Sequence, residues 1–518
     1  MDSPRENNKR IAKNTAMLYL RMLLTMIVAL YTSRLILAAL GVADLGIYDL
    51  VGGVVLLFNI LTDAMGAATQ RFLNYSLGKD DIDDMRRIFS MSMTVHISIA
   101  IVVLILSETV GLWMVNTLLD IPSYRMIAAN WVYQFSILSI CIQIIRIPYV
   151  ASIIAYERMS FYAYIGIAEV LLKLLIVFLL LADRNFDRLI LYSILMTATM
   201  LLLSYAYKLY CNRYLNTCRY QLFWDKTLYK KLLSFSGWSM MGSAANVSVQ
   251  QGGNILLNLF YGVSLNGAMG VGNRLATAIY GFASNFQMAF NPSIVKYYAA
   301  GDRDAFINLI FRTSRYSYYL LFIIILPVFL CCHFLMDLWL ESVPAYASSF
   351  CQLILIYQLI NATAAPLWIS AQATGQIRNY QILVSSLILL NLPLIYLVLY
   401  LGWSPISLVA VNIVVNLIVF FARLFYLGHH ISLPVRRYLY QVLGRIFIIT
   451  VISIPLPWFI HEHLEGWTAL LATTFTSLVC TSSAIYFLGM DIGERTAVLS
   501  HIKKRLDPFY QKYDRDKR

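Results

Sequence analysis

Ten charged side chains fall inside the longest apolar stretches of this sequence, and they set its possible chemistry. They are Arg21, Arg34, Asp49, Asp63, Glu108, Arg146, Glu169, Lys173, Arg274 and Arg423. A charge in an apolar environment costs roughly a few kcal/mol, so each one needs a partner, an escape to water or a function. Glu169 and Lys173 are four residues apart, a spacing that favours an ion pair on one helix. Arg21, Glu108 and Arg423 lie near the ends of their stretches, where a long side chain reaches water.

Three arginines remain, and their chemistry suits phosphate. Arg34, Arg146 and Arg274 are the best candidates to face an internal cavity. The planar guanidinium group binds phosphate oxygens through two parallel hydrogen bonds, so a cavity with surplus arginine favours a phosphorylated ligand. Asp49 and Asp63 leave two alternatives open, because they either neutralise these arginines in a buried network or bind a coupling ion, Na⁺ or H⁺.

Polar or small side chains recur at helical spacing in three stretches, which places them on one face of each helix. The stripes are Asp49, Gly52, Asn59, Asp63, Gly66 and Gln70; Ser239, Ser243, Asn246, Gln250, Asn254 and Asn258; and Gly270, Asn273, Thr277, Tyr280, Ser284, Gln287 and Asn291. One interpretation is that these residues hold helices together. The other is a water-filled cavity, which long amide stripes favour because unsatisfied polar groups avoid lipid. The side chains that we then expect to contact sugar hydroxyls are Asn59, Asn246, Gln250, Asn254, Asn273, Thr277, Ser284 and Gln287.

The composition is that of a membrane protein. Of the 518 residues, 59% are hydrophobic and 13% are charged, whereas roughly a quarter of an average soluble protein is charged. A water-soluble enzyme is therefore close to excluded. The net charge of +13 indicates basic loops beside a membrane rather than a nucleic-acid partner.

Fourteen apolar segments are each long enough to cross a bilayer as a helix, which takes about 20 residues. Their approximate limits are 14–40, 46–69, 88–114, 126–154, 161–182, 188–210, 232–261, 266–290, 312–336, 347–373, 379–401, 405–427, 441–460 and 466–489. With both termini in the cytoplasm, the outer loops hold just three of the 40 lysine and arginine residues, namely Arg125, Arg184 and Arg188. This asymmetry supports that orientation and an even number of spans.

An internal repeat divides the chain. The motif GVADLG that begins at Gly41 recurs as GVSLNG at Gly262, an offset of 221 residues, and Ala155 recurs with its neighbours as Ala373, an offset of 218. The repeat covers six spans, so the halves have parallel topology, and transporters commonly bind substrate between such halves. We therefore expect an N-lobe at 1–215, a C-lobe at 216–430, an extra pair of spans at 431–490 and a basic cytoplasmic tail at 491–518.

The segment 13–48 resembles the N-terminal signature of the polysaccharide-biosynthesis (Wzx-type) flippases of the multidrug/oligosaccharidyl-lipid/polysaccharide (MOP) exporter superfamily. The matching pattern is Arg34, then Leu40-Gly41, then Gly46-Ile47-Tyr48. The resemblance implies two MATE-like, V-shaped six-helix lobes in the bacterial inner membrane. It also implies alternating access that carries an undecaprenyl-diphosphate-linked oligosaccharide from the cytoplasmic to the periplasmic leaflet, for O-antigen, capsule or exopolysaccharide assembly.

The same resemblance implies further roles. Arg34 and Arg274, with Arg146, would hold the diphosphate, and the last two spans, with Trp458 and Trp467, would form a groove for the lipid tail. Other polysaccharide-assembly membrane proteins are expected partners.

Two alternatives stay open. One is a cation-coupled multidrug exporter of the MATE type, which Asp49 or Asp63 would serve. The other is a membrane-embedded enzyme, which the short outer loops disfavour, so we expect no catalytic residues. The triplet 461–463, His-Glu-His, lacks the spacing of a zinc peptidase, and we expect no metal site there.

Overall fold

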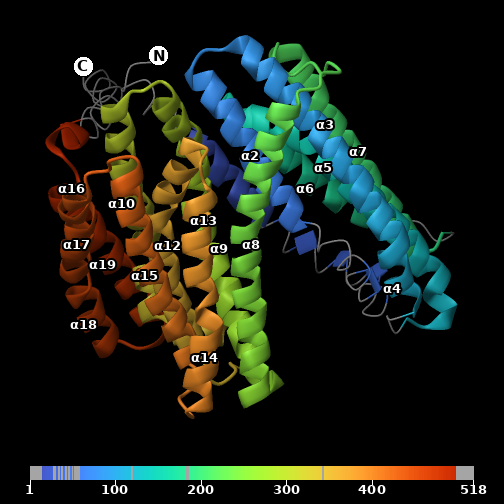
Figure 1. Cartoon of the computed structure of the whole chain (residues 1–518). Coiled ribbons are helices and arrows are strands. Elements are labelled where there is room, and N and C mark those ends of the chain that lie inside the picture. Colours follow the sequence, from blue (N-terminus) through green and yellow to red (C-terminus); the bar gives the residue numbers. More distant parts are fainter. Residues whose placement is uncertain are drawn as a thin grey trace, which may run out of the picture. The chain divides into compact units, whose positions relative to one another are not determined.

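The fold is all-helical. A computed structural model describes residues 14–26, 59–117, 121–182, 186–340 and 343–496, with scattered residues between 28 and 51. Side chains are described from residue 65 of the second range onward, and those of 263 and 264 are not described. Every regular element in the described ranges is a helix, which confirms the predicted fold class (Figure 1).

The first half of the chain folds around one long helix. Its elements are α2 (Asn59–Gly78), α3 (Ile82–Leu106), the π-helix η1 (Ser107–Gly111), α4 (Leu112–Thr117), the 3₁₀ turn η2 (Ser123–Arg125), α5 (Met126–Ala155), α6 (Met159–Ala182) and α7 (Arg188–Tyr214). α5 packs against α2, α3, α6 and α7. Tyr133 and Ile137 of α5 are buried in the apolar core that these helices share. The central position of α5 means that a polar side chain on it meets other helices rather than lipid alone.

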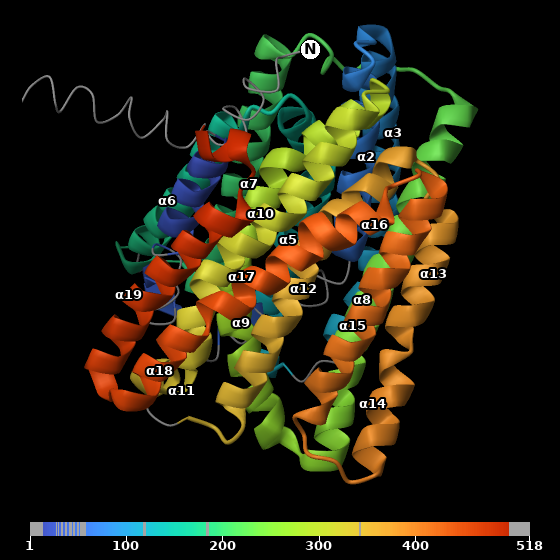
Figure 2. The ribbon, with the colours of Figure 1, turned by 90° about the vertical axis from the view of Figure 1, so that its left-hand side faces the viewer.

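The second half begins with two very long helices. Its elements are α8 (Lys226–Tyr261), α9 (Val263–Ala299), α10 (Arg303–Leu330), α11 (Cys332–Trp339), α12 (Ala347–Thr374), α13 (Arg378–Leu389), α14 (Asn391–Tyr400) and α15 (Ser407–His430). The added segment holds α16 (Val435–Tyr438), η3 (Leu439–Gly444), α17 (Arg445–Ser453), α18 (Pro455–His463), α19 (Gly466–Ala484) and η4 (Ile485–Gly489). It packs on α10, where the Tyr318 hydroxyl lies 2.7 Å from the Thr450 hydroxyl (Figure 2).

The described residues contain ten helical segments that are long and apolar enough to cross a membrane. The chain is therefore a multi-pass membrane protein. The predicted segments 126–154 and 347–373 correspond closely to α5 and α12. The segment 46–69 overlaps α2, which continues to Gly78 because helices extend beyond their apolar parts. α8 and α9 are not among the ten, since their polar stripes lower the mean hydropathy.

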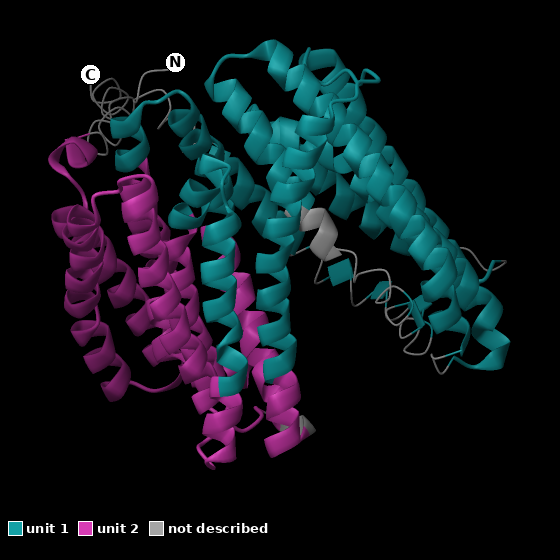
Figure 3. Cartoon of the chain, viewed as in Figure 1, with its two compact units in different colours: residues 1–253, 284–308, 366–393 teal, residues 254–283, 309–365, 394–518 magenta. Residues whose placement is uncertain are grey.

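Two compact units emerge from the internal contacts (Figure 3). Unit 1 contains residues 1–253, 284–308 and 366–393, and unit 2 contains 254–283, 309–365 and 394–518. The boundary cuts through α8, α9, α10, α12 and α14, so the ends of several second-half helices belong to the unit of the first half. The division into lobes at 1–215 and 216–430 stays a prediction.

Candidate functional site

Arg146 lies on the central helix α5, nine residues before the end of that helix, which is about 13 Å along its axis. Its guanidinium carbon lies 5.5 Å from the ring centre of Tyr207 on α7. One of its amino groups approaches the sulfur of Met200 at 3.8 Å. Arg146 is half-buried, so this predicted site residue sits at depth inside unit 1.

Arg21 approaches the same place from the first described helical stretch. Its guanidinium carbon lies 4.3 Å from the ring centre of Tyr162 on α6. The guanidinium also lies against Gly166, where even one added carbon would overlap it. The prediction that Arg21 reaches water stays a prediction, and the structure adds a contact with an aromatic ring while Arg21 is half-buried. The missed signal is Gly166, a small residue that permits close approach on an otherwise bulky helix.

Lys173 and Glu169 complete the group. Lys173 Nζ lies 2.7 Å from Glu169 Oε1, which confirms the predicted pair on α6. Tyr207 interacts electrostatically with Arg146, Arg21 and Glu169, so these charges share one neighbourhood. The cationic cluster is defined as Arg21, Arg146, Tyr162, Glu169, Lys173 and Tyr207.

The cationic cluster has more positive than negative charge. It contains three cations and one carboxylate, and Lys173 already contacts that carboxylate. Within the described part of the chain, neither Arg21 nor Arg146 forms an ion pair with an acid. Aromatic rings offer both guanidinium groups a weak cation–π contact and leave their N–H donors available. This arrangement suits an anion that several N–H groups can bind together.

The stripe on α9 is partly exposed, and Arg274 lies beside it. Arg274, Thr277 and Ser284 are exposed on this helix. Asn273 is half-buried, and Gln287 is buried. Arg274 forms no ion pair with any of the described residues. An arginine and a threonine exposed in mid-helix do not face lipid, because the cost of their polar groups there is high. We therefore expect this face of α9 to contact water.

The stripe on α8 behaves similarly. Asn246, Gln250 and Asn258 are exposed, Asn254 is half-buried and Ser239 is buried. The Asn246 amide donates a hydrogen bond to the carbonyl of Gly242 in its own helix at 2.8 Å, which satisfies only part of its capacity. Amides with unused donors and acceptors on a helix face can bind hydroxyl groups.

Four predicted site residues remain outside what the structure describes. Arg34 and Asp49 lie outside the described residues, and the side chains of Asn59 and Asp63 on α2 do so as well. Their roles in binding phosphate, sugar or a coupling ion stay predictions.

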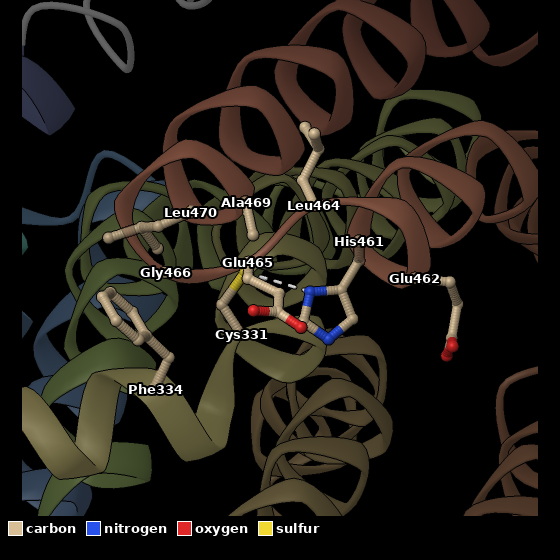
Figure 4. A pocket seen from close by; sticks show the side chains of 9 residues that line it. All are labelled: Cys331, Phe334, His461, Glu462, Leu464, Glu465, Gly466, Ala469 and Leu470. Carbon is tan, nitrogen blue, oxygen red and sulfur yellow. Dashed lines mark hydrogen bonds between the residues drawn. The ribbon is translucent and has the colours of Figure 1, made fainter.

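A pocket in unit 2 lies where α18 turns into α19, beside the start of α11 (Figure 4). Its volume is about 290 Å³, and Cys331 Sγ approaches His461 Nδ1 at 3.8 Å. Glu462 points away from that pair, and Glu465 is exposed. No three His, Cys, Asp or Glu side chains in the described ranges are placed to hold a metal ion.

A second group of arginines lies beside the residues that follow η4. We define the tail anchor as Arg312 and Arg315 of α10, Arg445 of α17, and Asp491 and Glu494. Arg315 is buried and lies 3.2 Å from Asp491, Arg445 lies 2.7 Å from the same carboxylate, and Arg312 lies 2.8 Å from Glu494.

The charges of the tail anchor shift the acidity of its exposed carboxylate. Partial burial alone would raise the pKa of Asp491, but hydrogen bonds and charge attraction from Arg445 and Arg315 outweigh it and hold that pKa below its usual range. Each arginine of the tail anchor thus has a carboxylate partner, in contrast to Arg21 and Arg146, which have none among the described residues.

Comparison with known proteins finds similar three-dimensional structures but no similar sequences. No protein-family model matches the sequence, and no curated protein matches it. A solved MOP superfamily transporter from Pyrococcus furiosus, whose binding pocket is described as having reverse polarity that suggests a different function, has a TM-score of 0.66 at 10% identity and covers 83% of this chain and 96% of its own. An outward-facing multidrug resistance MATE family transporter gives 0.67 at 10% identity, covering 82% and 96%.

A third similar structure extends over more of the chain. The MATE transporter ClbM in complex with Rb⁺ has a TM-score of 0.58 at 13% identity and covers 93% of this chain and 95% of its own. Identities this low establish the fold alone. The chain has the fold of the MATE and other transporters of the MOP superfamily.

Proposed function

We propose that this protein is a flippase of the MOP superfamily that moves an undecaprenyl-diphosphate-linked oligosaccharide from the cytoplasmic to the periplasmic leaflet of a bacterial inner membrane. The observation that carries the proposal is the cationic cluster, in which Arg21, Arg146 and Lys173 outnumber Glu169. Surplus guanidinium at membrane depth attracts an anion, and the planar fork of arginine matches the oxygens of a diphosphate.

The glycan would be bound by neutral polar groups. Tyr162, which is half-buried, supplies an aromatic ring next to Arg21 of the cationic cluster. The exposed amides Asn246 and Gln250 on α8 and the hydroxyl of Thr277 on α9 suit sugar hydroxyl groups. Arg274, exposed on the same helix as Thr277, has the chemistry to contact phosphate as well.

Transport would proceed by alternating access, with the polyprenyl tail left in lipid. A membrane potential that is negative inside favours outward movement of the anionic headgroup by about 2.3 kcal/mol per charge per 100 mV. The same potential favours the return of the empty cationic site toward the negative inside. Coupling of Na⁺ or H⁺ at Asp49 or Asp63 stays a prediction. Trp458 and Trp467, both exposed on the added segment, support a groove for the lipid tail.

A cation-coupled multidrug exporter is the competing function, because a solved multidrug MATE transporter has the same fold. A carrier of cationic drugs needs surplus negative charge at its binding site. The cationic cluster has the opposite sign, which is why we favour the flippase. Neutralising Asp49 or Asp63 would raise drug sensitivity and leave surface glycan unchanged if the multidrug function were correct.

The test is the substitution Arg146→Gln, with Arg146→Lys as the conservative variant. Loss of one arginine–phosphate contact should reduce glycan export about tenfold or more, while Lys should restore part of it. Accumulation of lipid-linked glycan in the cytoplasmic leaflet and the amount of surface glycan are the measurements. Arg213→Gln is the matched control, because Arg213 lies at the exposed end of α7 against Tyr214. Normal export by Arg146→Gln, and by Arg34→Ala and Arg274→Ala, would remove the cationic-site proposal.

A further inference from the structure

Four helix ends meet within unit 1, and they come from both sequence repeats. The offset of 221 residues makes α9 the equivalent of α2, and the offset of 218 makes α12 the equivalent of α5. The C-terminal ends of all four helices belong to unit 1, in which residues 284–308 and 366–393 cluster with the first half of the chain (Figure 3). Contacts among these ends therefore join the two repeats.

The first contact runs from α2 to the end of α12. The buried guanidinium of Arg71 donates to the carbonyl of Gln372 at 3.1 Å and to the carbonyl of Ala373 at 2.9 Å. The last carbonyls of a helix have no partner within it and carry its negative dipole end, so a cation is favourable there. Gly375 follows with φ +77°, and any side chain at that position would collide with Arg71.

The second contact runs from α9 to the end of α5. Lys296 Nζ lies 2.7 Å from Glu157 Oε1, and the two side chains are 18% and 1% exposed. Glu157 is held with φ +56°, a conformation that glutamate rarely adopts. A strained residue with a nearly inaccessible charge persists only where its surroundings fix it, and such positions are typical of functional switches.

These two contacts are reciprocal. Adding 218 to 157 gives 375, so Glu157 and Gly375 are equivalent positions with the same left-handed backbone after equivalent helices. In each case a cation from the α2-type helix of one repeat binds the end of the α5-type helix of the other repeat. The partner differs, because Arg71 binds backbone carbonyls and Lys296 binds a carboxylate.

A third contact brings the backbones together. A carbon added to Gly78, the last residue of α2, would lie 2.6 Å from the carbonyl oxygen of Lys296 and 2.8 Å from the side chain of Ala299. The ends of α2 and α9 therefore touch without an intervening side chain, which leaves no room for water or a sugar at this point.

We propose that Arg71 and the Glu157–Lys296 pair form a reciprocal clamp that closes the cytoplasmic entrance between the repeats. The clamp rests on the proposed function, because it must open for the glycan headgroup to enter. The predicted orientation puts all four helix ends on the cytoplasmic side. Because both halves of the clamp join the same two repeats, opening one half releases the other, and this coupling distinguishes a gate from two independent structural contacts.

The test is hydrogen–deuterium exchange on the purified full-length protein in detergent, without any glycan. In Glu157→Gln, exchange should increase about tenfold or more at 153–160 and 293–300, where a buried ion pair is broken. The clamp also predicts increased exchange at 370–376, the segment that Arg71 binds. The reversed pair Glu157→Lys with Lys296→Glu should restore protection at all three segments.

Arg437→Gln is the control, since Arg437 is exposed on α16, where its Nε donates to Gln441 Oε1 at 2.9 Å, and should leave all three segments unchanged. If Glu157→Gln yields no folded protein, Lys296→Met tests the same pair. An increase confined to 153–160 and 293–300, or no increase, would overturn the clamp. Because no glycan is involved, that result would leave the flippase proposal standing, whereas normal export by the Arg146 variants would leave the exchange result standing.

Discussion

Two groups of arginines in this protein differ in what surrounds them. In the tail anchor, Arg312, Arg315 and Arg445 all contact a carboxylate of Asp491 or Glu494. In the cationic cluster, Arg21 and Arg146 lie over aromatic rings, and the described residues supply no acid to either. The difference shows that the number of arginines in an apolar chain does not reveal their role. Whether carboxylates match them separates an anchoring group from a binding group.

The largest expected effect is on folding, at Arg315. Its side chain is 4% exposed, and it bridges Asp491 and the carbonyl of Gly489. Arg315→Met should destabilise the protein by about 2 kcal/mol, because the carbonyl of Gly489 loses a buried hydrogen-bond donor and Asp491 and Glu494 each lose one of their two cations. The measurement is the thermal midpoint of the purified protein in detergent. Arg146→Gln should by comparison change export and leave the midpoint nearly unaltered. Equal midpoints for Arg315→Met and the wild type would remove the distinction between the two groups.

A smaller effect should appear on acidification. The pKa of Asp491 is held below its usual range, so its contribution to stability is present above the unfolded pKa of about 4 and is lost as pH falls through the folded value. The wild type should therefore have a higher thermal midpoint than Asp491→Asn at pH 7, and the two should converge below about pH 4. A difference that stays constant with pH would show that Asp491 acts through packing instead.

The smallest effect is expected at Glu169, the one acid of the cationic cluster. Its pair with Lys173 is four residues apart on one helix, and such local pairs contribute about 0.3 to 0.5 kcal/mol. Glu169→Gln should shift the thermal midpoint far less than Arg315→Met does. A shift as large as that of Arg315→Met would mean that Glu169 anchors the helices, and the contrast between the two groups would fail.

Hydropathy predicts most of the fold, because a span must be both apolar and long. The segment 188–210 corresponds to α7, and 466–489 corresponds to α19 with η4. The pattern misses where helices extend into water, as at the start of α8, where Lys226, Lys230 and Lys231 precede the apolar part. Hydropathy detects the membrane-embedded part of a helix and not its polar ends.

The candidate site is less readable from sequence, because its contacts join distant residues. Arg146 could be singled out as a charge deep in a span, and the Glu169–Lys173 pair follows from helical spacing. The approach of Arg21 to Tyr162, 141 residues later, follows no local period. The ion pair of Lys296 with Glu157, 139 residues earlier, likewise depends on how the helices pack.

The contact at Gly78 determines how the end of α2 can move. The backbones of α2 and α9 cross here with no side chain between them, so no flexible side chain can adjust to a change in their separation. Such a contact is either closed or separated, because tightly packed interfaces switch between discrete arrangements and do not stretch. The contact between the ends of α2 and α9 should therefore switch between two positions, closed and separated, and should not stretch gradually.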